Sequence, residues 1–332
     1  MKRWFSLIMW GLACILISLL LWQLLVLRTI QGSLSVESEP TKTKTPIFHI
    51  AALLYSPERD QFFERAYSSM KKAALSNGSA LQLFEYSKAQ SIEEIRKLLH
   101  LVRDIGPDGL ILSLPSTTPF EQEIGEIIEK GIPIVSYETD PISIKHTAHI
   151  GTNPFELGKL TGLAIINRFT SPQHLGILLS FGGGYNTTQN ASFIQGLNHS
   201  IREKPGFTVS LVRTVTDPQI GVEKFLKDII KIEPSLDIII CTSARDTEAM
   251  AQALVDLDRV GKPAIIGFGD EPAIQSLIKE GVINATINRN PEIGGKLAVE
   301  SLLALIQNIR TNAFQDPGAT ILYPEAIRRT EK

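Results

Sequence analysis

From residue 46 onward, short apolar runs alternate with longer amphipathic segments. Continuous apolar runs are typical of strands buried on both faces of a parallel sheet, and apolar residues at helical spacing indicate helices that cover the sheet. In the first part we predict strands at 47–54, 80–86, 109–114, 132–137 and 147–150, and helices at 60–76, 91–105 and 119–130. Ser91 and Glu94 form a capping box at the second helix. The alternation predicts an α/β fold.

The same pattern begins again after residue 150. We predict helices at 154–169, 187–202, 219–232, 246–260, 272–280 and 292–309, and strands at 174–180, 207–215, 237–241, 264–268, 283–287 and 320–323. Two consecutive sets of βα units predict two doubly wound lobes, each with a parallel sheet. Such sheets bind ligands beyond the carboxyl ends of their strands, so we expect the site in a cleft between the lobes.

The first 45 residues follow a different pattern. Residues 4–27 are uncharged and mostly apolar. As a helix they would reach about 36 Å, which exceeds the roughly 30 Å hydrocarbon core of a bilayer. Lys2 and Arg3 precede the run and favour a cytoplasmic N-terminus. We therefore predict a transmembrane anchor at 1–30, a flexible polar tether at 31–45, and an extracytoplasmic globular part on a single-pass protein of the cell membrane.

Two alternatives to a permanent anchor stay open. Residues 11–14 (GLAC) resemble the lipobox of bacterial lipoproteins, which would make Cys14 a lipidation site. Cleavage is the other alternative, although the apolar run is longer than that of a signal peptide and lacks an A-x-A-like site. The second cysteine, Cys241, lies in an apolar run and is predicted to be a buried strand residue, so the pair forms neither a disulfide nor a metal site.

The composition and the motif content argue against several classes of protein. A formal net charge of −2 provides no broad basic surface for nucleic acid. The 6 histidines are scattered and lack metal-ligand spacing, and neither a G-x-S-x-G elbow nor a Walker motif occurs. We therefore expect no enzyme, no cofactor and no metal site.

Six segments occur in the order in which a known family carries them. They are LLYSPERDQFFERAYSSMKKAA, GPDGLILSLPST, KGIPIVSYETD, AHIGTNPFELGKLTG, IIGFGDEP and ATINRNPEIGGKLAVESLLALI. Over residues 46–330 the chain resembles the type I periplasmic binding proteins of the ribose/galactose-binding group. The resemblance implies two lobes joined by a hinge with three chain crossings. It places 46–150 with 291–316 in the first lobe, and 151–290 with 317–332 in the second.

In the first lobe, the resemblance implies ligand residues after the first and fourth strands. The candidates are Ser56, Asp60, Phe62, Phe63 and Glu138. Asp60 is also a reasonable helix N-cap, and Phe63 lies on the core face of its helix, whereas Phe62 lies off that face and is expected to stack on the ligand. Glu138 stands where ribose-type members carry an acidic residue, with a solvated loop residue as the alternative. Thr139 replaces the neighbouring Arg of that pattern, which argues against ribose itself.

In the second lobe, the implied ligand residues are Asn190, Asp246, Asp270 and Arg289. Asn190 aligns near a position where the family usually has Arg. Asp246 follows a strand and could instead cap the next helix. Asp270 ends a Gly-Phe-Gly-Asp run where the family commonly has Gly-Phe-Asp. Arg289 takes the place of a common Gln, which suggests a ligand rich in hydroxyls or an anionic sugar.

The resemblance implies a receptor for a monosaccharide or polyol, in which aromatic rings stack on the sugar and polar side chains satisfy its hydroxyls. We expect it to serve an ABC importer permease, and the alternative is a sensor subunit that signals through a membrane histidine kinase. Related repressors carry a helix-turn-helix where this chain has its apolar run, so no nucleic acid is expected. Phe62 and Arg289 are expected on opposing walls of the cleft, both facing water in the open form.

Overall fold

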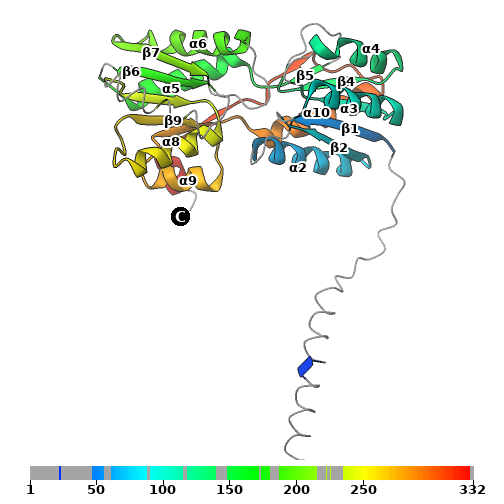
Figure 1. The fold of residues 1–332 in the computed structure, drawn as a ribbon, viewed down its shortest axis with the longest axis horizontal. Helices are drawn as coiled ribbons and strands as arrows, with labels where there is room; N and C mark the ends of the chain where they lie inside the picture. The colour runs from blue at the N-terminus through cyan, green and yellow to red at the C-terminus, as the bar shows by residue number, and fades with distance from the viewer. Residues whose placement is uncertain are drawn as a thin grey trace, which may run out of the picture. The chain divides into compact units, whose positions relative to one another are not determined.

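The computed structural model describes residues 22–23, 47–55, 61–87, 90–114, 118–139, 148–171, 173–179, 187–214, 222, 225 and 235–329 (Figure 1). The chain divides into two units, 1–45 and 46–332. In the first unit only Trp22 and Gln23 are described, and both are helical. Apart from these two residues, the predicted anchor and tether, with Cys14, fall outside the described residues. Within the described part of the chain, no helix combines the length and hydropathy that a membrane span requires.

Within the second unit, lobe 1 is built around a parallel sheet with the strand order β11-β5-β4-β3-β1-β2. Its strands are β1 (His49–Tyr55), β2 (Ala80–Tyr86), β3 (Gly109–Leu112), β4 (Ile134–Tyr137), β5 (Ala148–Ile150) and β11 (Phe314–Gln315). Its helices are α2 (Gln61–Ser76), α3 (Ile92–Ile105), the 3-10 turn η1 (Thr118–Phe120), α4 (Glu121–Glu129) and α10 (Pro291–Ile306).

Lobe 2 repeats this arrangement with the order β12-β10-β9-β8-β6-β7. Its strands are β6 (Gln173–Leu179), β7 (Phe207–Thr214), β8 (Ile238–Cys241), β9 (Ala264–Phe268), β10 (Ala285–Asn288) and β12 (Thr320–Leu322). Its helices are α5 (Pro154–Arg168), α6 (Thr187–Ile201), α8 (Ala244–Asp256), α9 (Pro272–Lys279) and α11 (Pro324–Arg329). The edge strand β12 runs antiparallel to β10, whereas the other pairings are parallel.

These two sheets confirm the predicted fold class of two doubly wound lobes. Among the described strands, the chain passes between the sheets after β5, after β10 and again between β11 and β12. The helix α10, which follows the second passage, packs on α2 and on the lobe 1 strands β3, β4 and β5. The carboxyl ends of strands from both sheets therefore adjoin the segments that connect the lobes.

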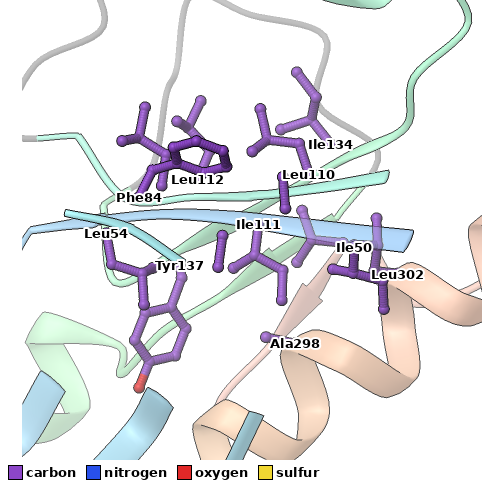
Figure 2. Close-up of a cluster of buried hydrophobic side chains, with 14 of the residues drawn as sticks. Ile50, Leu54, Phe84, Leu110, Ile111, Leu112, Ile134, Tyr137, Ala298 and Leu302 are labelled. Atoms are coloured by element: carbon purple, nitrogen blue, oxygen red, sulfur yellow. The ribbon is translucent and has the colours of Figure 1, made fainter. Parts of the chain in front are cut away.

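In the core of lobe 1, the continuous apolar run of β3 buries side chains on both faces of the sheet. Leu110 and Leu112 lie on one side of β3 and Ile111 on the other, where Ala298 and Leu302 of α10 cover the sheet (Figure 2). All of these side chains are at most 2% exposed. Burying a Leu or Ile side chain contributes about 1.5–3 kcal/mol, so both faces of the strand stabilise the lobe.

Lobe 2 divides its core between the two faces of its sheet. Ile238 and Ile240 belong to the cluster under α5 and α6, whereas Ile239 and Cys241 belong to the cluster under α8 and α9. This alternation is the two-residue period of a strand. Cys241 is fully buried, as predicted. Burial, with the nearby Asp246 carboxylate, raises the pKa of its thiol well above the usual value.

The predictions that rest on short stretches of sequence are confirmed in one case, fall outside the described residues in another, and miss two short elements. The capping box is confirmed, because the Glu94 amide donates to Ser91 Oγ while the Ser91 amide donates to Glu94 Oε2. The predicted helix at 219–232 lies almost wholly outside the described residues, where only Val222 and Phe225 are described, as helical and buried. The two-residue strand β11 and the short helix α11 were missed, since neither is long enough to show a periodic pattern.

Candidate functional site

An ion pair joins the two lobes at the second passage between the sheets. Glu138 directly follows β4 in lobe 1, and Arg289 directly follows β10 in lobe 2. Arg289 Nη1 donates to Glu138 Oε2 at 3.0 Å. The two side chains are 11% and 4% exposed. Glu138 is therefore not the solvated loop residue that the sequence left open. Removing one partner would leave a buried charge uncompensated, a change that costs about 3–5 kcal/mol.

The same guanidinium lies on an aromatic ring from the other lobe. Arg289 Cζ is 4.0 Å from the centroid of the Phe62 ring, a cation–π geometry. Phe62 also stacks on Tyr137, with centroids 6.5 Å apart and the rings inclined by 21°. It contacts Phe63 edge to face at 5.3 Å. We call Phe62, Tyr137, Glu138 and Arg289 the interlobe cluster.

These contacts correct the expectation that Phe62 and Arg289 both face water. Phe62 is only 7% exposed and belongs to the lobe 1 core. The prediction that it lies off the buried helix face is wrong, because it stands four residues before the buried Ala66 and so lies on the same side of α2. The covering groups are Tyr137 at the end of β4 and Arg289 from lobe 2. Both side chains therefore contribute to stability as well as being candidates for ligand contact.

Unusual backbone geometry occurs at both ends of the ion pair. Glu138 has φ +61°, and Asn290, next to Arg289, has φ +50°. Residues other than glycine rarely occupy this left-handed region, Asn being more tolerant of it than Glu. Such strain costs of order 1–3 kcal/mol and concentrates at functional sites. The strained backbone at Glu138 turns the chain away from β4 just where the carboxylate meets Arg289.

A second, more open ion network includes the candidate Asp270. Both of its carboxylate oxygens bind the guanidinium of Arg65 on α2, with Nη2 at 3.1 Å from Oδ2. Arg65 Nε also donates to Glu292 Oε1 at 2.6 Å. Asn288 Nδ2 donates to Asp270 Oδ2 at 2.9 Å. The hydrogen bond with Asp270, outweighing the opposing effect of burial, raises the pKa of Arg65.

Asp246 is not the N-cap of α8, the alternative role that the sequence left open. The N-cap of α8 is Ser243, whose Oγ accepts from the Asp246 amide at 3.1 Å. Asp246 is thus the third residue of the helix, and it is fully buried. The prediction of a helix starting at 246 is wrong because Ser243 provides the side-chain acceptor three residues before it.

The remaining candidates are placed as follows. Phe63 is 4% exposed and packs edge to face on Tyr55 at 5.9 Å, which confirms its place on the core face. Asn190 is half-buried on α6 in lobe 2. Ser56 and Asp60 lie outside the described residues. Phe62, Phe63, Glu138 and Arg289 are thus brought together by the structure, whereas Asp270 belongs to the Arg65 network.

Sequence reasoning missed three residues that complete these contacts. Tyr137 had been assigned only to a strand, and its place as the last residue before Glu138 is the signal that could have indicated it. Arg65 lies three residues after Phe62 on α2, so helical spacing puts the two on neighbouring positions. Glu292 is in the first turn of α10. Neither Arg65 nor Glu292 could be paired from the sequence, because 227 residues separate them.

A hollow among the described residues lies away from the interlobe cluster. It has a volume of about 760 Å³ and is lined by residues 106–108, 130–134 and part of the C-terminal end of α10. These residues precede β3 and β4, so the hollow is at the amino ends of the strands. Parallel sheets bind ligands at the opposite ends. We therefore assign the candidate site to the interlobe cluster.

The family model described as periplasmic binding protein domain matches residues 50–309. This chain belongs to that family. The family consists of substrate-binding proteins, in agreement with the prediction that the chain is not an enzyme. A comparison with curated proteins found no match.

Solved structures share the fold of this periplasmic binding protein domain at low identity. GanP, a glucose-galactose binding protein from Geobacillus stearothermophilus, has a TM-score of 0.74 and 20% identity, covering 84% of this chain and 98% of that chain. An ABC transporter periplasmic solute binding protein from Actinobacillus succinogenes 130z, with bound D-allose, has a TM-score of 0.76 and 16% identity, covering 85% and 99%. The XylFII-LytSN complex has a TM-score of 0.73 and 20% identity, covering 85% and 100%.

Proposed function

We propose that this chain is an extracytoplasmic receptor, tethered to the cell membrane by residues 1–30, that binds a monosaccharide or polyol between its lobes and delivers it to an ABC permease. The observation that carries the proposal is the interlobe cluster, in which an aromatic face and two charged side chains from different lobes meet at the carboxyl ends of β4 and β10. Membership of the periplasmic binding protein family supports binding rather than catalysis as the role of the chain.

The chemistry of the cluster suits a sugar. Phe62 provides an apolar face for ring C–H groups, and a guanidinium and a carboxylate form strong charge-assisted hydrogen bonds with hydroxyls. In this structure Arg289, Glu138 and Phe62 satisfy one another. A sugar would replace these contacts with its own, and each of its hydroxyls would need a partner because a desolvated hydroxyl without one is costly. Structural relatives that bind glucose-galactose or D-allose support this class of ligand.

Because the charges of Arg289 and Glu138 compensate each other, the pair favours a neutral ligand. Among the described residues, Asp246 is a further buried acidic group of lobe 2. An anionic sugar would need an uncompensated cation, since burying a charge without a partner is unfavourable. We therefore expect neutral aldoses, ketoses or polyols rather than uronic acids.

The test is thermal unfolding of the full-length protein with a panel of neutral sugars, polyols and uronic acids. A ligand at 100 times its Kd should stabilise the native state by about 2.7 kcal/mol. Arg289→Ala should weaken binding roughly 10- to 150-fold in calorimetry, because charge-assisted hydrogen bonds contribute about 1.5–3 kcal/mol. Arg168→Ala is the control for loss of an arginine ion pair, since Arg168 pairs with Glu325 within lobe 2. Stabilisation by a peptide or a metal ion, and by no sugar or polyol, would contradict the proposal.

The alternative is a sensor that presents the same sugar-bound domain to a membrane histidine kinase. One structural relative was solved in complex with another protein, LytSN, which favours keeping this candidate. The neighbouring genes distinguish the two: a permease with an ATPase supports import, and a kinase with a response regulator supports sensing. N-terminal sequencing tests the tether, because a mature start near residue 30 or a lipidated Cys14 would exclude the uncleaved helix.

A further inference from the structure

Arg65 connects three segments that belong to different parts of the fold. It projects from α2 in lobe 1, and its two terminal nitrogens bind the two carboxylate oxygens of Asp270, which lies between β9 and α9 in lobe 2. Its Nε and Nη2 bind Glu292 in the first turn of α10, at 2.6 and 3.1 Å. One guanidinium therefore spans the lobes and also contacts the helix that follows the second passage.

Asp270 is in turn fixed by groups of lobe 2. Asn288 at the end of β10 donates to its Oδ2 at 2.9 Å, and Gln275 of α9 donates to its carbonyl oxygen at 2.7 Å. Asn288 Oδ1 also accepts from the Asn290 amide at 3.0 Å. The carboxylate is 16% exposed on its side chain, and its two oxygens face the guanidinium fork. This is the bidentate geometry in which an Arg–carboxylate pair is strongest and most directional.

We propose that Arg65 is a positioning residue, and that its pairing with Asp270, here called the interlobe clamp, sets how far the two lobes separate without either side chain contacting the sugar. Asp270, a ligand candidate from the sequence, is thereby reassigned to the control of lobe closure. A rotation of the lobes about their connecting segments would pull the Asp270 carboxylate away from α2, so the clamp belongs to one arrangement of the lobes. Losing the clamp favours the separated arrangement.

The clamp acts on binding through the population of the closed form. The apparent Kd equals the intrinsic Kd divided by the fraction of molecules in the competent arrangement. A clamp that forms only when the lobes are close raises that fraction. The effect on affinity rests on the proposed function, whereas the effect on lobe separation does not depend on any ligand.

The chain offers a closely matched control in Arg96 on α3. Its guanidinium also binds two carboxylates, Glu93 on the same helix and Glu123 on α4. Its side chain is 29% exposed, compared with 28% for Arg65. Both of its partners lie in lobe 1, so its network does not cross between the lobes.

The experiment compares Arg65→Met and Arg96→Met in the full-length protein. Spin labels on cysteines introduced at the exposed positions Lys97 in lobe 1 and Glu248 in lobe 2, with Cys14→Ser, report the distance between the lobes without ligand. We expect Arg65→Met to shift the distribution to longer distances and Arg96→Met to leave it unchanged. Raising NaCl from 0.05 to 0.5 M should lengthen the distances in the parent protein and have little effect on Arg65→Met, because salt screens an ion pair that is only partly buried.

Sugar affinity provides the second readout. We expect Arg65→Met to bind the sugar about tenfold more weakly, which corresponds to about 1.4 kcal/mol. Adding Asp270→Leu to Arg65→Met should cause no further loss, since the clamp is already absent. A further tenfold loss in the double variant would instead make Asp270 a ligand residue and overturn the reassignment.

Unchanged label distances in Arg65→Met, or an equal lengthening in Arg96→Met, would overturn the clamp. If the distances respond as expected but no sugar binds the parent protein, the proposed function fails and the clamp stands. Circular dichroism of each variant identifies a loss of folding, and in that case Arg65→Lys, which keeps the charge but not the fork, takes the place of Arg65→Met.

Discussion

The two lobes share a strand order but differ in the residues on their most closely packed pair of helices, which is α2 with α10 in lobe 1 and α5 with α6 in lobe 2. In lobe 2, α5 and α6 approach through two glycines: a Cβ on Gly196 would lie 1.9 Å from the Phe155 carbonyl oxygen, and one on Gly158 would lie 2.0 Å from the Phe193 carbonyl oxygen. In lobe 1, α2 and α10 approach through Gly295, where a Cβ would lie 2.2 Å from the Ala66 carbonyl oxygen.

The lobe 1 pair holds the groups that face the other lobe. Phe62 and Arg65 lie on α2, and Glu292 lies on α10. The lobe 2 pair carries only the half-buried Asn190 among the candidates. Close packing of α5 on α6 therefore stabilises the interior of lobe 2, whereas close packing of α2 on α10 holds the contacts that lobe 1 makes with lobe 2. Substitutions in the two pairs should separate stability from binding.

The largest effect is expected from the buried phenylalanines. Phe193→Ala removes a fully buried ring that packs edge to face on Phe268 at 6.2 Å, and should cost about 3–5 kcal/mol of unfolding free energy. Phe62→Ala should cost less, roughly 2 kcal/mol, because water can enter at the lobe boundary, but it should weaken sugar binding at least tenfold. Denaturant titration and calorimetry measure the two quantities. Equal binding losses in both variants would remove the distinction between the lobes.

The glycine contacts come next. Gly196→Ala and Gly295→Ala each force a methyl group against a backbone carbonyl, and overpacking of this kind costs about 1–3 kcal/mol. We expect only Gly295→Ala to weaken sugar binding as well, since moving α10 from α2 displaces Glu292 from Arg65. Chemical denaturation with parallel binding titrations checks both. Loss of affinity in Gly196→Ala at a temperature where it is fully folded would count against this assignment.

The smallest effect is expected on the rate at which a thiol reagent labels Cys241. This measurement changes no contact of the folded protein and reports on the opening of lobe 2. The pKa of the Cys241 thiol is raised by burial, and thiolates are the reactive form, so the native protein with Cys14→Ser should resist labelling by a thiol reagent. Labelling should be faster in Gly196→Ala than in Gly295→Ala if the lobes open separately. Equal acceleration would show instead that the lobes unfold as one cooperative unit.

The sequence by itself determined the order of the described strands and helices apart from β11 and α11, because apolar periodicity reports burial on each element without reference to its neighbours. Residues 238–241 show this: a continuous apolar run predicts a strand covered on both faces, and Ile239 and Ile240 are indeed buried on opposite sides of β8. The capping box at Ser91 is equally local, since its partners are three residues apart. The resemblance then identified Glu138 and Arg289 as candidates, each from its own strand end.

Only the tertiary structure decided how these candidates are used. Glu138 and Arg289 are 151 residues apart in sequence, and their pairing depends on how strands from two sheets end near one another. Phe62 lies one turn before Ala66 on the buried side of α2, but the groups that cover it, Tyr137 and Arg289 of the other lobe, are brought there only by the tertiary structure. The pairing of Asp270 could not be predicted for the same reason, since its partner Arg65 lies 205 residues away in the sequence. Helical and strand periods describe one element at a time, whereas contacts between lobes depend on the chain closing loops of a hundred residues or more.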